Sequence, residues 1–231
     1  MKKIKSQLSV SLNNIQQAWI KETDSVIVEK FNNAINELNN SGISKTALQV
    51  NDRVIDFELN NALGKTVKLS VLLQKGPVIL TWYRGGWCPY CNIQLQYMQR
   101  YLPQFKEEGA ILVALTPELP DKSLDTKEKN ELKFEILTDL NNDVARKFGI
   151  VFILNNELVK IYNGRLKTFN GVETNELPIP ATYVIGQDYL IKYAFVDSNH
   201  RHRAEPTDIL SVLKTLKAMS PTLPLQNTAA R

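Results

Sequence analysis

The sequence predicts an α/β protein in which helices flank a largely parallel sheet and a helical extension precedes the sheet. From residue 50 onward, short β-rich runs alternate with amphipathic helical stretches, which is typical of a layered α/β domain. Before residue 50, apolar residues recur at spacings of three and four, which indicates helices. The 231 residues are enough for one domain with extensions, or at most for two domains.

Residues 1–49 form the predicted extension. Its apolar positions indicate one or two amphipathic helices, and the Asn-rich stretch that ends at Gly42 stops the pattern. The positions are Leu12, Ile15, Trp19, Ile27, Phe31, Ile35 and Leu38. We expect these helices to pack on the core of their own chain, with a contact between two copies in a homodimer as the alternative.

Residues 50–219 form the predicted domain, and residues 220–231 look like a loosely ordered tail. The expected strands are 53–59, 67–69, 78–83, 110–116 and 134–138, followed by a hairpin of 181–185 and 190–196. The expected helices are 89–108, 119–130, 142–148 and 207–219. Residues 155–177 contain Gly164, Gly171 and several Asn, so we interpret them as an irregular insertion.

Charge and hydropathy exclude several classes of protein. The 28 Lys and Arg against 24 Asp and Glu give a net charge of +4, and the densest basic stretches, near Lys3 and at 200–203, are too short for a nucleic-acid interface. No apolar run reaches the length of about 7–15 residues that a signal peptide needs, or the 18 or so of a membrane span. We therefore expect a cytoplasmic protein that binds neither nucleic acid nor membranes.

The only two cysteines, Cys88 and Cys91, are separated by Pro89 and Tyr90. A disulfide framework would need cysteines far apart in the sequence, so the pair is interpreted through its reactivity. Zinc would need two further ligands, and the two histidines, at 200 and 202, match no standard spacing. Inert buried thiols are the other alternative. We expect no metal and no organic cofactor.

The context of Cys88 favours a thiolate. A buried strand, 78–83, leads into a Gly-Gly turn, and Pro89 fits the first position of the following helix, so Cys88 falls at or next to the N-cap. Unpaired N–H groups and the helix dipole favour a negative sulfur there. Cys88 is the predicted nucleophile. Cys91, nearly one turn further, is the predicted resolving cysteine, which would attack an oxidised Cys88.

Residues from about 50 to 217 resemble the peroxiredoxin-like branch of the alkyl hydroperoxide reductase and thiol-specific antioxidant family. The motifs that carry the resemblance are Asp56-Phe57 with Gly64-Lys65, the segment WYRGGWCPYC at 82–91, Pro180 to Ile185, and Arg203-Ala204-Glu205-Pro206. The resemblance implies a thioredoxin-like fold with a central mixed sheet flanked by helices. It also implies reduction of a small-molecule peroxide, with electrons from a thioredoxin-like or glutathione reductant.

In thioredoxin-like folds a cis proline lies opposite the cysteine pair, and by resemblance Pro180 takes this place and presents the backbone of Ile179 to a bound thiol. An ordinary trans proline is the alternative. The chain departs from peroxiredoxins in having Gly85 where they have Thr or Ser, and Pro180 where they have an Arg. A cation can instead come from Arg84, or from Arg201 or Arg203, and a solvated surface charge is the alternative for each.

The leading hypothesis is a thiol peroxidase in which Cys88 attacks the peroxide and Cys91 resolves the product. The first alternative is a thiol-disulfide oxidoreductase acting on protein or glutathione disulfides, for which Cys88, Cys91 and Pro180 suffice. The second is a binding module that keeps the fold without turnover.

Overall fold

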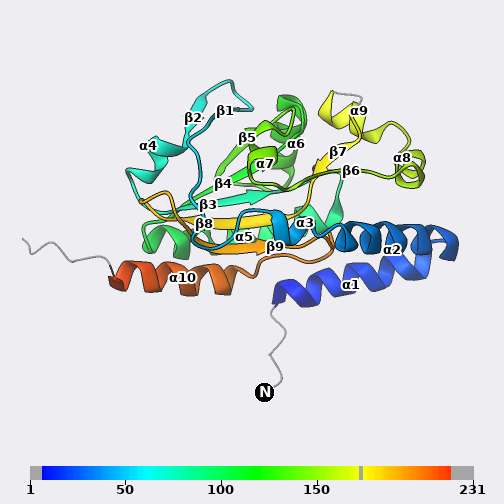
Figure 1. The fold of residues 1–231 in the computed structure, drawn as a ribbon, viewed down its shortest axis with the longest axis horizontal. Helices are drawn as coiled ribbons and strands as arrows, with labels where there is room; N and C mark the ends of the chain where they lie inside the picture. Colours follow the sequence, from blue (N-terminus) through cyan, green and yellow to red (C-terminus); the bar gives the residue numbers. More distant parts are fainter. Residues whose placement is uncertain (1–6, 172–173, 220–231) are drawn as a thin grey trace, which may run out of the picture.

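A seven-stranded mixed sheet forms the centre of the computed structural model, which describes residues 7–171 and 174–219 (Figure 1). The strands lie in the order β2-β1-β5-β4-β3-β8-β9. Their bounds are β1 (Glu58–Asn61), β2 (Thr66–Lys68), β3 (Val78–Trp82), β4 (Ile111–Thr116), β5 (Glu135–Thr138), β8 (Ala181–Ile185) and β9 (Ile191–Val196). A separate antiparallel pair is formed by β6 (Val151–Ile153) and β7 (Glu176–Pro178).

Strand β3 runs parallel to β4, and β4 runs parallel to β5, whereas the other neighbours in the sheet are antiparallel. The mixed sheet implied by the resemblance is confirmed, and the expectation of a largely parallel sheet is wrong. The reason lies in the connections: β1 and β2, and β8 and β9, are joined by short turns, which can link only antiparallel neighbours.

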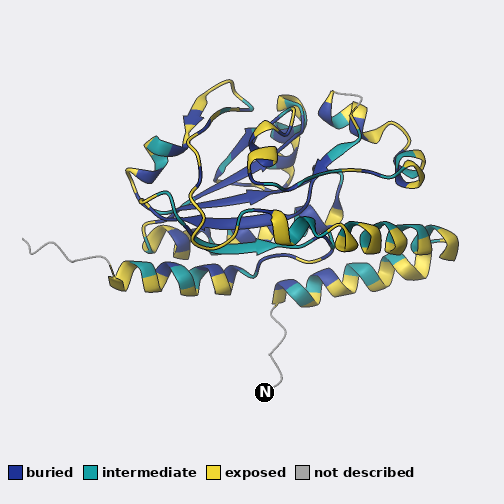
Figure 2. Cartoon of the chain, in the orientation of Figure 1, coloured by how far each residue is buried: buried dark blue, intermediate teal, exposed yellow. Residues whose placement is uncertain are grey.

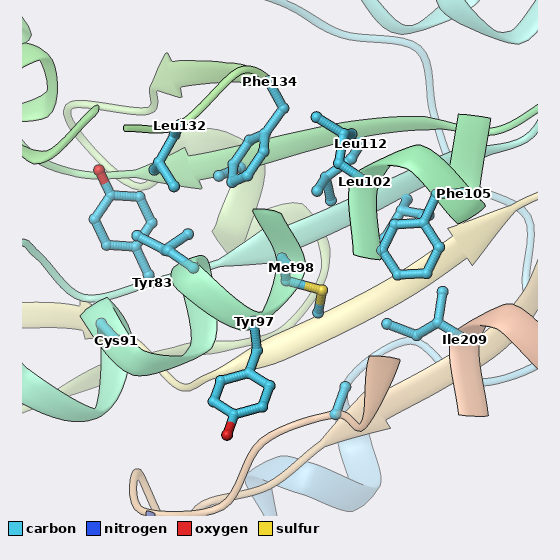
Figure 3. Packing of buried hydrophobic residues seen from close by; sticks show 14 of the residues in the cluster. Tyr83, Cys91, Tyr97, Met98, Leu102, Phe105, Leu112, Leu132, Phe134 and Ile209 are labelled. Atoms are coloured by element: carbon cyan, nitrogen blue, oxygen red, sulfur yellow. The ribbon is translucent and has the colours of Figure 1, made fainter. Parts of the chain in front are cut away.

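Side chains of β3 alternate between the two faces of the sheet. Val78, Leu80 and Trp82 pack with α4 (Leu69–Leu73) and α7 (Asp143–Lys147), whereas Ile79 packs toward α5 (Pro89–Glu107) and α10 (Pro206–Met219). In Figure 3, Met98, Leu102 and Phe105 of α5 meet Leu112, Phe134 and Ile209, and Cys91 belongs to the same layer. Figure 2 shows the central strands β4, β3 and β8 buried between helices whose outer surfaces are exposed. Helix α5 therefore holds the cysteine pair against a close-packed core.

One expected strand is shorter than predicted, and another lies one residue earlier, at Thr66–Lys68. Residues 53–59 give a strand only from Glu58, because the Asp56 carboxylate accepts the N–H groups of Phe57 and Ser70 and holds the chain in a loop. Strand 67–69 ends at Lys68, where α4 begins. The other expected strands and helices are confirmed within about two residues at each end, including α6 (Pro120–Lys129) and the hairpin of β8 and β9.

The interpretation of residues 155–177 as irregular is wrong. They hold α8 (Asn156–Tyr162), α9 (Arg165–Asn170) and the start of β7, and Leu158, Tyr162, Leu166 and Leu177 form a small core of their own. The Asn and Gly residues that suggested a loop are helix ends: Asn155 caps α8 through a 3.0 Å hydrogen bond from the N–H of Leu158, and Asn163 has the left-handed conformation that ends it.

The extension consists of α1 (Gln7–Glu22), α2 (Ser25–Asn40) and the short α3 (Ile43–Thr46), and it packs on its own chain as expected. Leu8 and Leu12 of α1 join the core beside α5, and Ser11 Oγ lies 2.9 Å from Tyr97 Oη. Helix α2 contacts α8, where Lys30 pairs with Glu157 at 2.7 Å. Among the described residues no helix is long and apolar enough to cross a membrane. The expected tail, 220–231, lies outside them.

The close packing of Gly86 gives a test of the turn between β3 and α5. A Cβ on Gly86 would overlap Thr126 Oγ1 and lie 3.2 Å from Thr126 Cβ. We expect Gly86→Ala to lower the free energy of unfolding by about 1–3 kcal/mol, measured by urea unfolding. In a Thr126→Ala background the cost should be smaller, and an equal cost in both backgrounds would contradict this account.

Candidate active site

Cys88 is the N-cap residue of α5, and Pro89 begins the helix, as predicted. Cys91 lies in the first turn, with its N–H bonded to the Cys88 carbonyl at 3.0 Å. Both thiols are free and buried, with 1% of Cys88 and 0% of Cys91 exposed. Within the described chain, however, the Cys88 side chain accepts no capping hydrogen bond from the helix backbone. The expectation that N–H groups of the helix backbone bind this sulfur is therefore wrong, and its hydrogen-bond donor comes from a side chain.

That donor is Arg84, two residues beyond the end of β3. Its Nη2 donates to Cys88 Sγ at 3.2 Å, and its Nη1 donates to Tyr162 Oη at 3.4 Å. The guanidinium also lies over the ring of Trp87, 5.2 Å from its centroid. Only 4% of Arg84 is exposed. A buried guanidinium next to a thiol is strongly stabilised when the thiol is ionised, because each charge then has a partner.

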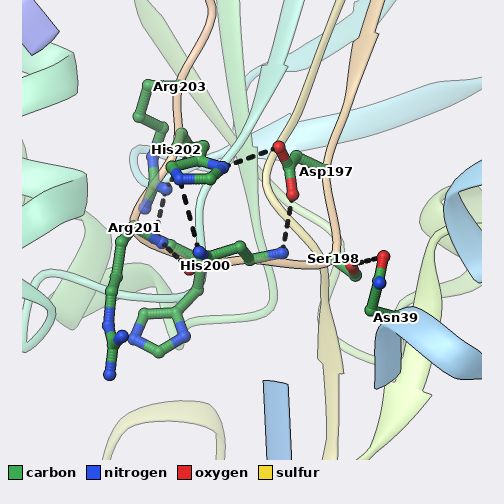
Figure 4. A network of polar contacts seen from close by, with 8 residues as sticks. Asn39, Asp197, Ser198, His200, Arg201, His202 and Arg203 are labelled. Atoms are coloured by element: carbon green, nitrogen blue, oxygen red, sulfur yellow. Dashed lines mark hydrogen bonds and ion pairs between the residues drawn. The ribbon is translucent and has the colours of Figure 1, made fainter. Parts of the chain in front are cut away.

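Arg203 serves Cys91 in a similar way. Its Nη2 donates to Cys91 Sγ at 3.4 Å, while Nη1 donates to the carbonyls of His200 and His202. Figure 4 shows the polar network that shapes this loop between β9 and α10. There the Asp197 carboxylate lies 2.9 Å from His202 Nδ1 and accepts the N–H of Asn199 at 2.8 Å. The loop thus aims Arg203 at the cysteine pair.

The two thiols differ in acidity. Burial alone would raise the pKa of Cys88, but the hydrogen bond from Cys91 and the charges of Arg84 and Arg203 outweigh it, so that the pKa lies well below its ordinary value. Burial raises the pKa of Cys91, and the hydrogen bond to Cys88 and the negative charge there raise it further. The prediction of an ionised Cys88 beside a protonated Cys91 agrees with this arrangement.

Of the three candidate arginines, Arg84 and Arg203 contact sulfur, whereas Arg201 donates to Asn32 Oδ1 of α2 at 2.9 Å. All three side chains are buried, with exposed fractions of 4%, 5% and 8% for Arg84, Arg203 and Arg201. The alternative of solvated surface charges is therefore wrong for each of them.

The expectation of a cis Pro180 is wrong, because no peptide bond among the described residues is cis. The two residues Ile179 and Pro180 connect β7 directly to β8, and the trans isomer, favoured by about 0.5–1 kcal/mol, fits this connection. The backbone of Ile179 is not offered to a ligand as expected, since its N–H donates to the carbonyl of Ile150 at 2.8 Å and the residue is buried. Pro180 lines a second cavity of about 220 Å³ that also touches Arg84.

The turn that carries Cys88 rests on Glu118, which sequence reasoning missed. The Gly86 N–H donates to Glu118 Oε1 at 2.7 Å, and Asn92 donates to the Gly86 carbonyl at 2.7 Å. Burial raises the pKa of Glu118, and the Gly86 hydrogen bond opposes it. The structure also explains Gly85, since a Cβ at this position would overlap the indole of Trp87. A Thr or Ser here would displace that ring.

Cys88 lines a cavity of about 310 Å³ whose walls also come from parts of the chain far from residue 88 in the sequence. Trp19 of α1 and Phe31 of α2 meet Tyr162 of α8 and His200 of the β9–α10 loop. The sequence marked Trp19 and Phe31 only as apolar helix positions, and nothing in it pointed to Tyr162. The N-terminal extension and residues 155–177 thus both contribute side chains to the surroundings of Cys88.

The pairing of Arg84 with Cys88 predicts the reactivity of the thiol. In wild-type protein the rate of alkylation of Cys88, followed against pH by mass spectrometry, should rise with an inflection well below about 8.5. Arg84→Met should move that inflection to higher pH, because burial is then opposed only by the Cys91 hydrogen bond and the charge of Arg203. Arg100→Met removes an exposed arginine that lies over Tyr97, away from the thiols, and serves as the control. Equal profiles for the two variants would contradict the assignment.

His200 gives a prediction about acid stability. Burial lowers its pKa well below 6.5, and the charges of Arg84, Arg203, Arg201 and His202 lower it further. Below about pH 6.5 the unfolded chain binds a proton at this residue that the folded chain does not. Stability is therefore lost as the pH falls below that value, by up to about 1.4 kcal/mol per pH unit until the folded-state pKa is reached.

Urea unfolding at pH 7.5 and 5.5 measures this contribution. His200→Gln should lose less stability than wild type between the two values, and an identical loss would show that His200 accepts its proton without cost to the fold.

Comparisons with known proteins identify the family of the chain. Residues 50–194 match the model of the AhpC/TSA family. The chain is 32% identical to the peroxiredoxin bcp of Buchnera aphidicola over 105 residues, which cover 46% of this chain and 66% of that protein. It is 23% identical to the thiol-disulfide oxidoreductase ResA of Bacillus thuringiensis over 130 residues, 56% of this chain and 74% of ResA.

Among solved structures, peroxidoxin BcpB of Mycobacterium tuberculosis is similar with a TM-score of 0.59 and 23% identity, covering 75% of this chain and 99% of that one. Peroxiredoxin 6 of Arenicola marina is similar with a TM-score of 0.57 and 20% identity, covering 74% of each chain. These two likenesses establish the thioredoxin-like fold. Together with the matched family model, which spans more than half of the sequence, they show that the chain belongs to the AhpC/TSA family.

Proposed function

We propose that the protein is a thiol-dependent peroxidase in which Cys88 attacks the peroxide and Cys91 resolves the product. The contact that carries the proposal is the 3.2 Å approach of Arg84 Nη2 to Cys88 Sγ, in a cavity large enough for a small substrate. The thiolate, not the thiol, is the nucleophile, and the lowered pKa of Cys88 supplies it. Membership of the AhpC/TSA family supports the same chemistry.

In the first step the Cys88 sulfur attacks the outer oxygen of a hydroperoxide. The O–O bond breaks and the sulfur gains that oxygen. The hydroperoxide proton moves from the attacked oxygen to the other oxygen, which leaves as water or an alcohol, so that a sulfenate remains on Cys88. The sulfur is oxidised and the peroxide is reduced. Arg84 lies where it can stabilise the negative charge on the thiolate and on the attacked oxygen.

In the second step the negative charge passes to Cys91. Once Cys88 is oxidised and protonated, the charge that raised the pKa of Cys91 is gone, and Arg203, 3.4 Å from Cys91 Sγ, is left to stabilise a thiolate there. The Cys91 thiol supplies the proton that the sulfenate takes up. The Cys91 thiolate then attacks the Cys88 sulfur, the S–O bond breaks, and the leaving hydroxide takes a proton from solvent to become water as the disulfide forms. A thioredoxin-like or glutathione reductant would restore both thiols.

Two observations favour a second candidate, a thiol-disulfide oxidoreductase. Position 85 lacks the Thr or Ser hydroxyl of peroxiredoxins, and the chain is 23% identical to ResA. The burial of both sulfurs counts against it, because a protein disulfide must reach the attacking sulfur directly. A homodimer and a cytoplasmic location stay predictions.

A coupled assay with thioredoxin, its reductase and NADPH tests the proposal. Wild type should consume hydrogen peroxide or cumene hydroperoxide, and Cys88→Ser should lose at least about 99% of the activity because no nucleophile remains. Cys91→Ser should turn over slowly and accumulate sulfenic acid on Cys88, detectable by trapping and mass spectrometry. Ser11→Ala in α1, which removes a hydroxyl that lies 2.9 Å from Tyr97 Oη, is the control for a small side-chain change.

The second candidate predicts a different pattern in the same experiment. Oxidation of Cys88 by peroxide no faster than that of free cysteine, together with rapid reduction of a protein disulfide, would replace the peroxidase by the oxidoreductase. If the protein shows neither activity and Cys88 titrates like a free cysteine, the binding module is the hypothesis that remains.

A further inference from the structure

The cavity at Cys88 is lined mainly by aromatic side chains. Trp19 and Phe31 meet edge to face with ring centroids 5.3 Å apart, and Trp87 and Tyr162 do the same at 5.2 Å. Tyr90 completes the set. Five rings around a volume of about 310 Å³ fit a compact apolar group, such as a single substituted ring, better than a long chain.

Three residues that line the cavity each carry a buried hydrogen-bond donor that has no acceptor among the described residues. These are Arg201 Nη2, Tyr90 Oη and Trp87 Nε1. Arg201 is 8% exposed and Tyr90 7% exposed, so both side chains are more than nine-tenths buried. A buried donor left without an acceptor costs free energy, which a ligand with acceptor oxygens would recover.

Charge favours an anion at this place. Arg84, Arg165 and Arg201 line the cavity, and the one carboxylate in its lining, Glu22, is exposed.

Arg84 faces the Cys88 sulfur, whereas no carboxylate of the described residues pairs with Arg201. Its other contacts are the Asn32 amide oxygen at 2.9 Å and the ring of Trp19 at 5.7 Å. Burial raises the pKa of the Tyr90 phenol, and the charge of Arg201 opposes this rise.

We infer that the cavity selects a compact aromatic hydroperoxide that bears a carboxylate, with the carboxylate bound by Arg201 and Tyr90 and the peroxide at Cys88. This inference rests on the proposed peroxidase function and names its substrate class. The carboxylate takes no part in the reaction. The O–O bond breaks as described above, the Cys88 sulfur takes one oxygen, and the product is the corresponding carboxylated alcohol. Arg201 and Tyr90 are thus positioning residues that increase binding near the nucleophile.

A matched pair of substrates tests the inference: cumene hydroperoxide and its para-carboxylated derivative, which share ring and peroxide. We expect kcat/KM for the carboxylated compound to exceed that for the neutral one by about tenfold or more, the effect of a charge-assisted hydrogen bond. Arg201→Gln should bring the ratio close to one. Tyr90→Phe, which removes only a hydroxyl without a partner in the described structure, should lower the ratio several-fold.

Arg100→Gln controls for the loss of one positive charge outside the cavity and should leave the ratio unchanged. If Arg201→Gln fails to fold because its contact with Asn32 is lost, the substrate ratio of Tyr90→Phe alone tests the inference. A wild-type ratio of one or less, with both compounds reduced, would overturn the inference and leave the peroxidase intact.

Binding of the product alcohols separates this inference from the proposed function. Trp19 and Trp87 line the cavity, so their fluorescence reports binding to Cys88→Ser, which cannot react. The carboxylated alcohol should bind about tenfold or more tightly than the neutral alcohol, and Arg201→Gln in that background should remove the difference. This result without any peroxide turnover would retain the anion site and reject the peroxidase. Equal binding of both alcohols would reject the site.

Discussion

The buried pair of Arg84 and Cys88 is the interaction on which the other features of the site depend. A guanidinium with 4% of its surface exposed and a thiol with 1% exposed are each unfavourable when charged alone, and together they are compatible with the core. Strand β3 ends just before the arginine, and α5 begins just after the cysteine. The Gly85-Gly86 turn between them therefore has to be tight. The Glu118 carboxylate stabilises this turn by accepting a hydrogen bond from the Gly86 N–H.

The second arginine, Arg203, opposes the difference in acidity between the two cysteines but does not remove it. Arg203 contacts Cys91, yet the burial of Cys91 and the adjacent charge on Cys88 keep its pKa high. The hydrogen bond to the Cys88 thiolate and its negative charge both raise the pKa of Cys91, and both are lost when Cys88 is oxidised and uncharged. Arg84 and Arg203 can thus favour a thiolate first on Cys88 and then on Cys91. The electrostatics require no movement of either guanidinium.

The sequence predicted the parts of the site that lie close together along the chain. The apolar strand, the Gly-Gly turn and Pro89 locate Cys88 at a helix start by local rules alone, and the structure confirms that position. It could not predict the enclosure, because Trp19, Phe31 and Tyr162 come together only through tertiary packing of α1, α2 and α8.

Local rules also failed where one residue type has two uses. Asn155 and Asn163 indicate loops when read singly, but they begin and end a helix. For Pro180, the resemblance to thioredoxin-like folds was preferred to the general preference for a trans bond before proline, and it gave the wrong isomer.

The two buried arginines also affect how easily a disulfide between the cysteines could be reduced. Such a disulfide would carry no charge, so Arg84 would lose its anionic partner at Cys88 while remaining in the core. Reduction returns that partner, and a couple whose reduced form is stabilised in this way has a higher reduction potential. In the proposed cycle, the guanidinium that prepares the sulfur for oxidation would thus also provide the driving force for its recovery by mild electron donors.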